Sequence, residues 1–148
     1  MRVLAFEDTY DLTAMLDAAG CNLSGVELVQ RWNSSEPLKH IKEHKPDVVL
    51  LDYFMPPHTG LEVLQMLNMA ARNKQLSRPN LIIGISSEAE ANEALAKEGA
   101  DACIIKFDIH TLDLWKTQTW GLRAMRLNSC CSCENHGRCC RCKFTLDG

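Results

Sequence analysis

Five side chains with chemical potential stand directly after short apolar runs of the sequence. The first run ends in Glu7 and Asp8, the third in Asp52, the fourth in Ser86 and the fifth in Lys106. In an open parallel sheet, the carboxyl ends of the strands meet at one edge, and function gathers there. We therefore expect three carboxylates, a hydroxyl and an amine to converge at one edge of a sheet.

Carboxylates on neighbouring strands repel each other, because like charges about 4 Å apart cost roughly 4 kcal/mol at an effective dielectric constant near 20. A divalent cation removes this repulsion, and Mg²⁺ prefers carboxylate oxygens, retained waters and phosphate, which suits Glu7, Asp8 and Asp52. Lys106 offers a positive charge to a phosphoryl oxygen, and Ser86 offers a hydroxyl donor. Together these groups indicate transfer of a phosphoryl group onto a carboxylate.

The elements that must position these residues alternate between short aliphatic runs and stretches of helical period, which is typical of a parallel sheet with crossover helices. The predicted strands span residues 2–6, 26–32, 48–51, 81–85 and 102–105. The predicted helices span residues 11–19, 37–45, 61–69, 88–98 and 112–125, with Asp8 or Thr9 capping the first. The uniformly aliphatic run 48–51 predicts a central strand. Five strands and five helices make a three-layer α/β domain.

Composition narrows the classes of function. Apolar residues make up 46% of the 148 residues and charged residues 24%, as in an ordinary globular domain. The net charge of -3 provides no overall basic field and argues against binding of nucleic acid. No apolar run is long enough for a membrane span, and acidic residues come too early for a signal peptide, so we expect a cytoplasmic protein.

Six of the eight cysteines crowd into thirteen residues near the C-terminal end. Together with one histidine between them they form a candidate soft-metal site for zinc or copper(I), made of Cys130, Cys131, Cys133, His136, Cys139, Cys140 and Cys142. The spacing matches no zinc-finger pattern, and redox or lipidation chemistry, or a segment without a role, stay as alternatives. From residue 123 on, five basic residues face two acidic ones, whereas residues 1–122 carry 11 and 17. We therefore expect a domain at 1–127 and a Cys-rich tail without an independent fold at 128–148.

The chain resembles a response-regulator receiver domain of two-component signalling, from Arg2 to about Leu127. The resemblance rests on four motifs in order: Phe6-Glu7-Asp8, residues 46–56 followed by Gly60, residues 82–87, and Gly99-Ala100-Asp101 leading to Lys106. It implies a flavodoxin-like, CheY-like α/β domain whose five-stranded parallel sheet has the order 2-1-3-4-5 and is flanked by five helices.

The resemblance also implies roles for single residues. Asp52 becomes the phosphoacceptor, which receives the phosphoryl group from a phosphohistidine of a histidine kinase or phosphotransfer protein. Asp8 binds Mg²⁺ directly, Glu7 binds it through water, and the backbone carbonyl of Phe54 supplies another ligand. Ser86 matches the switch hydroxyl that follows the phosphoryl group, and Lys106 matches the salt-bridge partner of that group. Such a domain catalyses only its own phosphorylation and dephosphorylation, and passes the signal to a downstream protein partner.

Three departures from the family pattern lie on the output side of the domain. Cys103 stands three residues before Lys106, where the family usually has an aromatic ring, and Phe107 replaces the usual proline after that lysine. The segment 86–99 is about two residues shorter than the common pattern. We therefore expect Cys103 to weaken the coupling between phosphorylation and output.

Two other functions compete with the phosphoryl-accepting one. A phosphatase of the haloacid dehalogenase type needs a second acid two residues after its nucleophile, where Phe54 stands. A non-phosphorylated receiver would serve as a protein-interaction module with a metal- or redox-sensitive tail. The intact set of site residues favours phosphoryl acceptance. We expect a stand-alone phosphorelay component, because residues 128–148 are too few for a standard DNA-binding domain.

Overall fold

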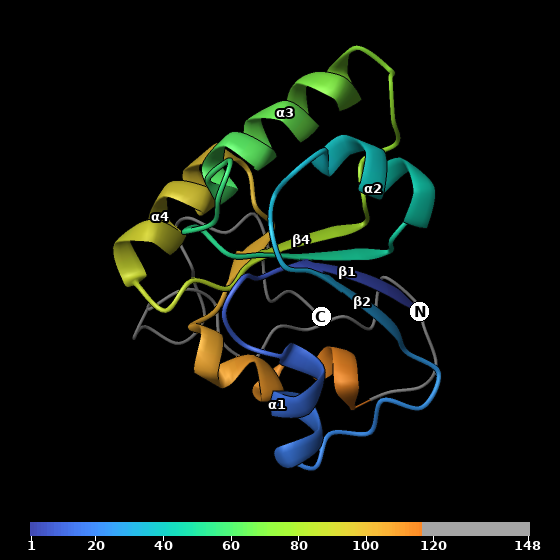
Figure 1. Ribbon diagram of the computed structural model, residues 1–148, viewed down its shortest axis with the longest axis vertical. Helices are drawn as coiled ribbons and strands as arrows, with labels where there is room; N and C mark the ends of the chain where they lie inside the picture. Colours follow the sequence, from blue (N-terminus) through green and yellow to red (C-terminus); the bar gives the residue numbers. More distant parts are fainter. Residues whose placement is uncertain (117–148) are drawn as a thin grey trace, which may run out of the picture.

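The five predicted strands form one parallel sheet of order β2-β1-β3-β4-β5 in the computed structural model, which describes residues 1–116 (Figure 1). The strands are β1 (Arg2–Phe6), β2 (Glu27–Arg31), β3 (Val48–Leu51), β4 (Leu81–Gly84) and β5 (Ala102–Cys103). Phe6 at the end of β1 pairs with Leu51 at the end of β3, and Leu51 pairs with Gly84 at the end of β4. This register aligns the carboxyl ends of the three central strands, and the fold class predicted from the sequence is confirmed.

Strand β3 is buried along its whole length, as its uniformly aliphatic sequence predicts. Val48 and Leu50 belong to the apolar core on one face of the sheet, and Val49 and Leu51 to the core on the other face. Successive side chains of a strand point to opposite faces, so a strand covered on both sides needs an apolar residue at every position. The prediction of a central strand at 48–51 is therefore confirmed.

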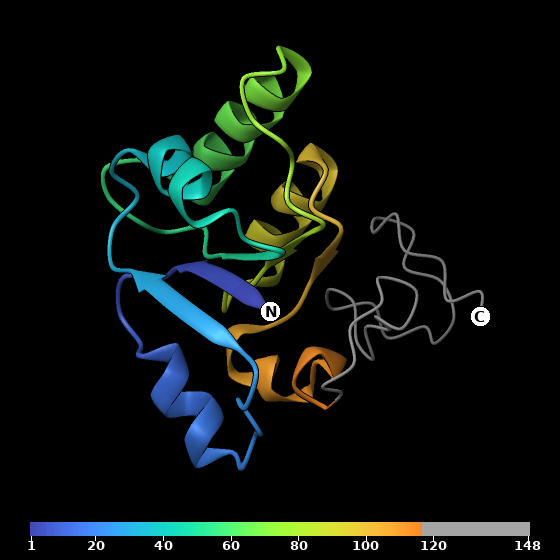
Figure 2. The same ribbon diagram turned by 90° about the vertical axis from the view of Figure 1, so that its right-hand side faces the viewer.

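Helices cover both faces of the sheet. They are α1 (Leu12–Ala18), α2 (Pro37–His44), α3 (Gly60–Arg72), α4 (Ala89–Glu98) and two 3₁₀ helices, η1 (Lys106–Thr111) and η2 (Asp113–Trp115). Figures 1 and 2 show α2, α3 and α4 on one face, and α1 beside η1 and η2 on the other. Of the helix predicted at 112–125, the described beginning is the short η2; residues 117–125 and the Cys-rich tail lie outside the described residues.

The first helix is capped by a different residue from the one that the sequence predicted. The carboxylate of Asp11, rather than Asp8 or the hydroxyl of Thr9, accepts the N–H of Ala14 at 3.0 Å. Asp8 instead accepts a hydrogen bond from the Thr9 hydroxyl at 2.9 Å. The four residues between Glu7 and the helix thus form a loop, and Asp8 is free to take part in the site at the strand ends.

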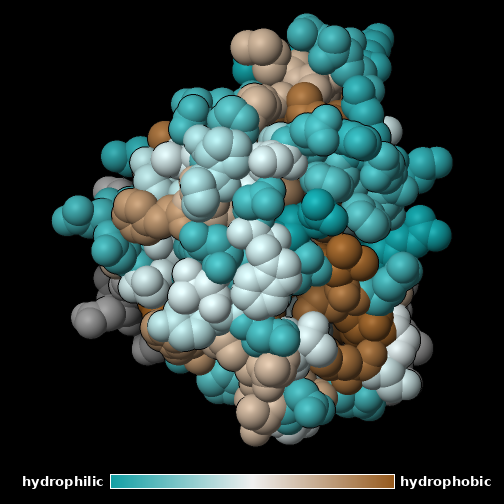
Figure 3. Space-filling model, in the orientation of Figure 1, coloured by the Kyte–Doolittle hydropathy of each residue, from teal (hydrophilic) through white to brown (hydrophobic). Residues whose placement is uncertain are grey.

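The surface in the orientation of Figure 1 is largely hydrophilic, with one apolar patch over β2 (Figure 3). Strand β2 is an edge strand, and its residues are partly exposed or exposed, unlike those of β3 and β4. None of the helices in residues 1–116 is long and apolar enough to cross a membrane.

Candidate acidic site at the carboxyl edge of the sheet

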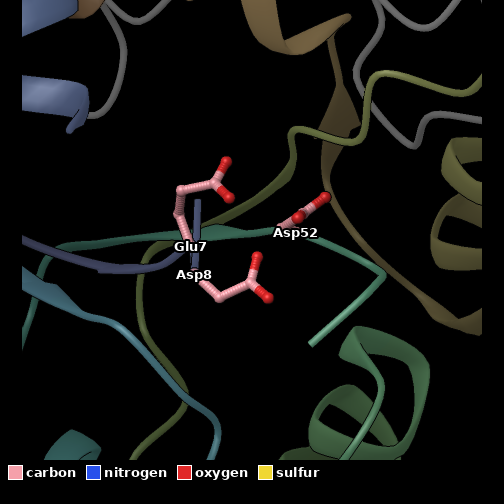
Figure 4. A group of neighbouring side chains, drawn as sticks. All are labelled: Glu7, Asp8 and Asp52. Atoms are coloured by element: carbon pink, nitrogen blue, oxygen red, sulfur yellow. The ribbon is translucent and has the colours of Figure 1, made fainter. Parts of the chain in front are cut away.

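Three carboxylates meet where β1 and β3 end. Oxygen atoms of Glu7, Asp8 and Asp52 all lie within 4.8 Å of one another, and Figure 4 shows the three side chains facing a common space. Glu7 is fully buried and Asp52 is 3% exposed, while Asp8 is partly exposed and opens the cluster to solvent. The paired ends of β1 and β3 produce this convergence, which the sequence predicted from strand positions alone.

Lys106 contacts two of the three carboxylates. Its ammonium nitrogen Nζ lies 2.8 Å from Glu7 Oε2 and donates a hydrogen bond to Asp52 Oδ2 at 3.1 Å. The residue is only 5% exposed, and its Nζ also lies 5.4 Å from the centre of the Tyr10 ring. A buried charge is tolerated when it is paired in this way. The predicted amine of the site is therefore an ion-pair partner of Asp52.

The electrostatic environment raises two pKa values. Burial raises the pKa of Asp52 and the negative charge of Glu7 raises it further, although Lys106 and the N–H of Tyr53 act in the opposite direction. Burial alone would lower the pKa of Lys106, but its contact with Glu7 and the charges of Asp52 and Glu7 outweigh this, so the pKa of Lys106 is raised. The amine consequently stays protonated at neutral pH, and the Asp52 carboxylate holds protons more tightly than usual.

The donor set suits a hard divalent cation. Three carboxylates face one ammonium group, so the cluster keeps an excess of negative charge. Glu7 Oε2 is buried, and its contact among the residues that the structure describes is the charged one with Lys106 Nζ at 2.8 Å. Oxygen ligands with unused lone pairs and partial access to water are what Mg²⁺ prefers. The residues present therefore fit the magnesium site expected from the sequence.

A glycine fixes the loop that follows Asp52. The N–H of Tyr53 donates to Asp52 Oδ1 at 2.8 Å, and the N–H of Gly60 donates to the Tyr53 carbonyl at 2.7 Å. A Cβ atom at Gly60 would overlap the backbone oxygen of Asp52. The first residue of α3 therefore has to be a glycine for the helix to approach the site this closely, a steric reason that the sequence motif did not reveal.

Ser34, a residue that the sequence reasoning missed, holds the same loop from the β2 side. Its buried hydroxyl donates to the His58 carbonyl at 2.6 Å and accepts the His58 N–H at 2.8 Å. Its own N–H donates to the Pro56 carbonyl at 3.0 Å. Phe54, whose carbonyl is a predicted metal ligand, lies in this loop with its side chain half exposed. The run of small polar residues before α2 reads as a helix start, so the sequence gives no signal for this role.

Ser86 is buried at the end of β4, but its hydroxyl is engaged locally. The hydroxyl oxygen accepts the N–H of Glu88 at 3.2 Å, and the Ser86 carbonyl accepts the backbone N–H of Lys106 at 3.3 Å. The backbone of Ser86 is therefore bonded to the backbone of Lys106, whereas the side chain of Ser86 contacts the loop that leads into α4.

Asn92 on α4 is a second residue that the sequence reasoning missed. Its side chain is buried, accepts the N–H of Ser86 at 2.9 Å, and donates to the carbonyls of Ser86 and Ile104. The thiol of Cys103 lies fully buried below it, with Sγ 3.2 Å from the Asn92 carbonyl oxygen. A polar residue at an inward position of an otherwise apolar helix face is the signal that could have found Asn92.

Comparison with known proteins identifies a family for this domain. The family model of the response regulator receiver domain matches residues 3–118 of this chain. The transcriptional regulatory protein PrrA of Mycobacterium bovis is 30% identical over 105 residues, which cover 71% of this chain and 43% of PrrA. The chain thus spans less than half the length of this curated relative.

Solved structures show the same architecture. The response regulator domain of Thermotoga maritima CheB is 27% identical, with a TM-score of 0.52 and coverage of 72% of this chain and 78% of that one. The chemotaxis response regulator CheY4 of Vibrio cholerae has a TM-score of 0.53 at 23% identity, with coverage of 71% and 85%. Because the family model covers more than half of the sequence and the sheet order agrees, the chain belongs to the response regulator receiver domains of two-component systems.

Proposed function

We propose that this receiver domain accepts a phosphoryl group on Asp52 from a phosphohistidine of a histidine kinase or phosphotransfer protein, with Mg²⁺ bound at the acidic cluster. The observation that carries this proposal is the position of the Asp52 carboxylate between two further acids and the buried ammonium group of Lys106. Receiver domains interact with such kinases and with downstream effectors, and the donor set here suits the metal that phosphoryl transfer requires.

The reaction makes one bond and breaks one. A carboxylate oxygen of Asp52 attacks the phosphorus atom, and the phosphorus–nitrogen bond to the donor imidazole breaks, so that the imidazole leaves with the electron pair. Asp52 Oδ1 accepts the Tyr53 N–H and Oδ2 accepts Lys106, which orients the carboxylate before the donor arrives. Mg²⁺, when bound through Glu7, Asp8 and Asp52, supplies positive charge to the phosphoryl oxygens.

Lys106 and Ser86 act on the phosphoryl oxygens. Lys106 is protonated and already lies against Asp52, so it stabilises negative charge that develops on the group being transferred. The Ser86 hydroxyl accepts a hydrogen bond from Glu88 but keeps its own proton, which it can donate to a phosphoryl oxygen. Its role as a switch hydroxyl is part of this proposal.

Within this proposal, the domain passes the signal to a downstream protein partner and does not bind nucleic acid by itself, because a net charge of -3 provides no overall basic field. Within this proposal, residues 1–127 form the receiver and residues 128–148 an appended Cys-rich segment. A receiver that is never phosphorylated and acts only as an interaction module is the competing function.

Incubation with acetyl phosphate and Mg²⁺, followed by intact-mass measurement and peptide mapping, tests the proposal. We expect one phosphoryl group on Asp52, no label in Asp52→Asn, and normal labelling in Asp47→Asn. Asp47 is a matched control, because it precedes the same strand at the opposite edge of the sheet, where it accepts the backbone N–H of Arg2. Labelling that persists in Asp52→Asn, or is absent from the wild-type chain, would refute the proposal.

A further inference from the structure

The side chain of Asn92 forms hydrogen bonds to the backbone of two loops of the site. Its oxygen accepts the N–H of Ser86 at 2.9 Å, and its nitrogen donates to the Ser86 carbonyl at 3.0 Å and to the Ile104 carbonyl at 3.1 Å. The residue is 1% exposed, so these bonds form away from water. A carboxamide has two N–H donors and one oxygen, and here all of them are paired with backbone groups.

These three bonds fix the two segments that carry functional side chains. Bonds to both the N–H and the carbonyl of Ser86 hold its backbone on each side of the Cα atom, which determines where its hydroxyl can reach. The bond to Ile104 holds the chain two residues before Lys106, whose own N–H is bonded to the Ser86 carbonyl. The side chain of Asn92 therefore links the backbone of Ser86, which bears the hydroxyl, to the segment that leads to Lys106, which bears the amine.

The short connection into α4 brings Asn92 into this place. Helix α4 begins at Ala89, three residues after Ser86, and packs against β4 and β5. A Cβ atom at Gly84 would lie 3.2 Å from Asn92 Oδ1 and 3.1 Å from Cys103 Sγ, so there is little free space between helix and sheet. The small side chains of Gly84 and Cys103 allow the carboxamide to reach the backbone.

We propose that Asn92 is a positioning residue of the phosphoryl-accepting site, which acts by holding Ser86 and the strand end before Lys106. The inference rests on the proposed function, because it concerns the group that Ser86 and Lys106 stabilise. Without the carboxamide, three buried backbone groups lose a partner, and the Ser86 hydroxyl and the Lys106 amine lose their fixed separation. Asn92 lies outside the acidic cluster, so binding of Mg²⁺ alone does not depend on it.

Titrations of the full chain with Mg²⁺ alone, and with beryllofluoride in the presence of Mg²⁺, separate the two effects. Beryllofluoride mimics the phosphoryl group on the aspartate. We expect Asn92→Leu to weaken beryllofluoride binding about fivefold or more, as loss of about 1 kcal/mol implies, with unchanged Mg²⁺ affinity. Asn68→Leu is the matched control, because Asn68 donates one bond from α3 to the Glu98 carbonyl, away from the site. It should bind both as the wild type does.

Combination with Ser86→Ala tests whether Asn92 acts through Ser86. We expect the affinity of the double variant for beryllofluoride to lie within about twofold of that of Ser86→Ala alone, because the effects of coupled residues are not additive. Fully additive losses would assign Asn92 a general structural role and overturn the inference. Should Asn92→Leu fail to fold, hydrogen exchange decides: the Ser86 amide and the Asn92 side-chain amide are expected to be protected, and exchange at the rate of free amides would overturn the inference.

The outcomes distinguish the two levels of the proposal. Beryllofluoride binding and phosphorylation that are normal in both the wild type and Asn92→Leu would refute the positioning role and leave the proposed function intact. A wild-type chain that binds neither beryllofluoride nor a phosphoryl group would refute the proposed function and the positioning role with it.

Discussion

Replacement of Asp8 by asparagine should stabilise the fold and weaken Mg²⁺ binding together. At the 4.8 Å that bounds the cluster, each pair of like charges costs about 3.5 kcal/mol at an effective dielectric constant near 20. Asp8 takes part in two such pairs, with Glu7 and Asp52, and the positive charge of Lys106 offsets part of this repulsion. Because Asp8 is partly exposed and therefore screened, we expect Asp8→Asn to gain about 1–2 kcal/mol.

Thermal unfolding followed by circular dichroism at low ionic strength measures both effects. Without metal, a gain of about 1–2 kcal/mol raises the Tm of a chain of this size by roughly 3–8 °C. With Mg²⁺ at tenfold its Kd, the wild type gains about 1.4 kcal/mol from binding, whereas the variant has lost a ligand and gains less. The difference in Tm between the two proteins should therefore shrink or reverse when Mg²⁺ is added.

The control is Asp17→Asn, which removes the same charge from an exposed position on α1. It should leave both the Tm without metal and the shift on addition of Mg²⁺ unchanged. The reasoning fails if Asp8→Asn melts below the wild type without metal, or if it keeps the full Mg²⁺-dependent shift.

Three further predictions follow from the site and the sequence. The raised pKa of Asp52 means that the folded state binds the proton of this carboxyl group more tightly than the unfolded state. The stability of the wild type relative to Asp52→Asn should therefore fall as the pH rises from 3.8 through the raised pKa. A stability difference that is independent of pH in this range would contradict this prediction. Gly60→Ala should destabilise the fold by about 1–3 kcal/mol in urea unfolding, because its Cβ overlaps the Asp52 backbone, and an unchanged midpoint would rule the overlap out. Elemental analysis under reducing conditions should find about one zinc or copper(I) ion per chain, lost on truncation after Leu127; equal metal in both would refute the Cys-rich site.

The sequence determined the sheet and its functional edge. Apolar runs of strand length separated by helical periods can be read locally, because each element carries its own period and its own terminators. The strand predicted at 48–51 has the same bounds as β3, and Asp52 follows it directly. Once the strands are parallel, the residues after them must share an edge, so the meeting of Glu7, Asp8 and Asp52 is predictable from the sequence.

The tertiary structure decided which groups touch at that edge. Lys106 pairs with Glu7 as well as with Asp52, across 99 and 54 residues of sequence, and no local pattern encodes such a pairing. The hydrogen bonds from Ser34 to the loop after Asp52, and those between Asn92 and Ser86, arise in the same way. A buried polar side chain must find partners wherever packing brings backbone groups close, and those partners come from other elements of the fold. Periodicity fixes the elements, whereas the contacts between them depend on how the elements pack.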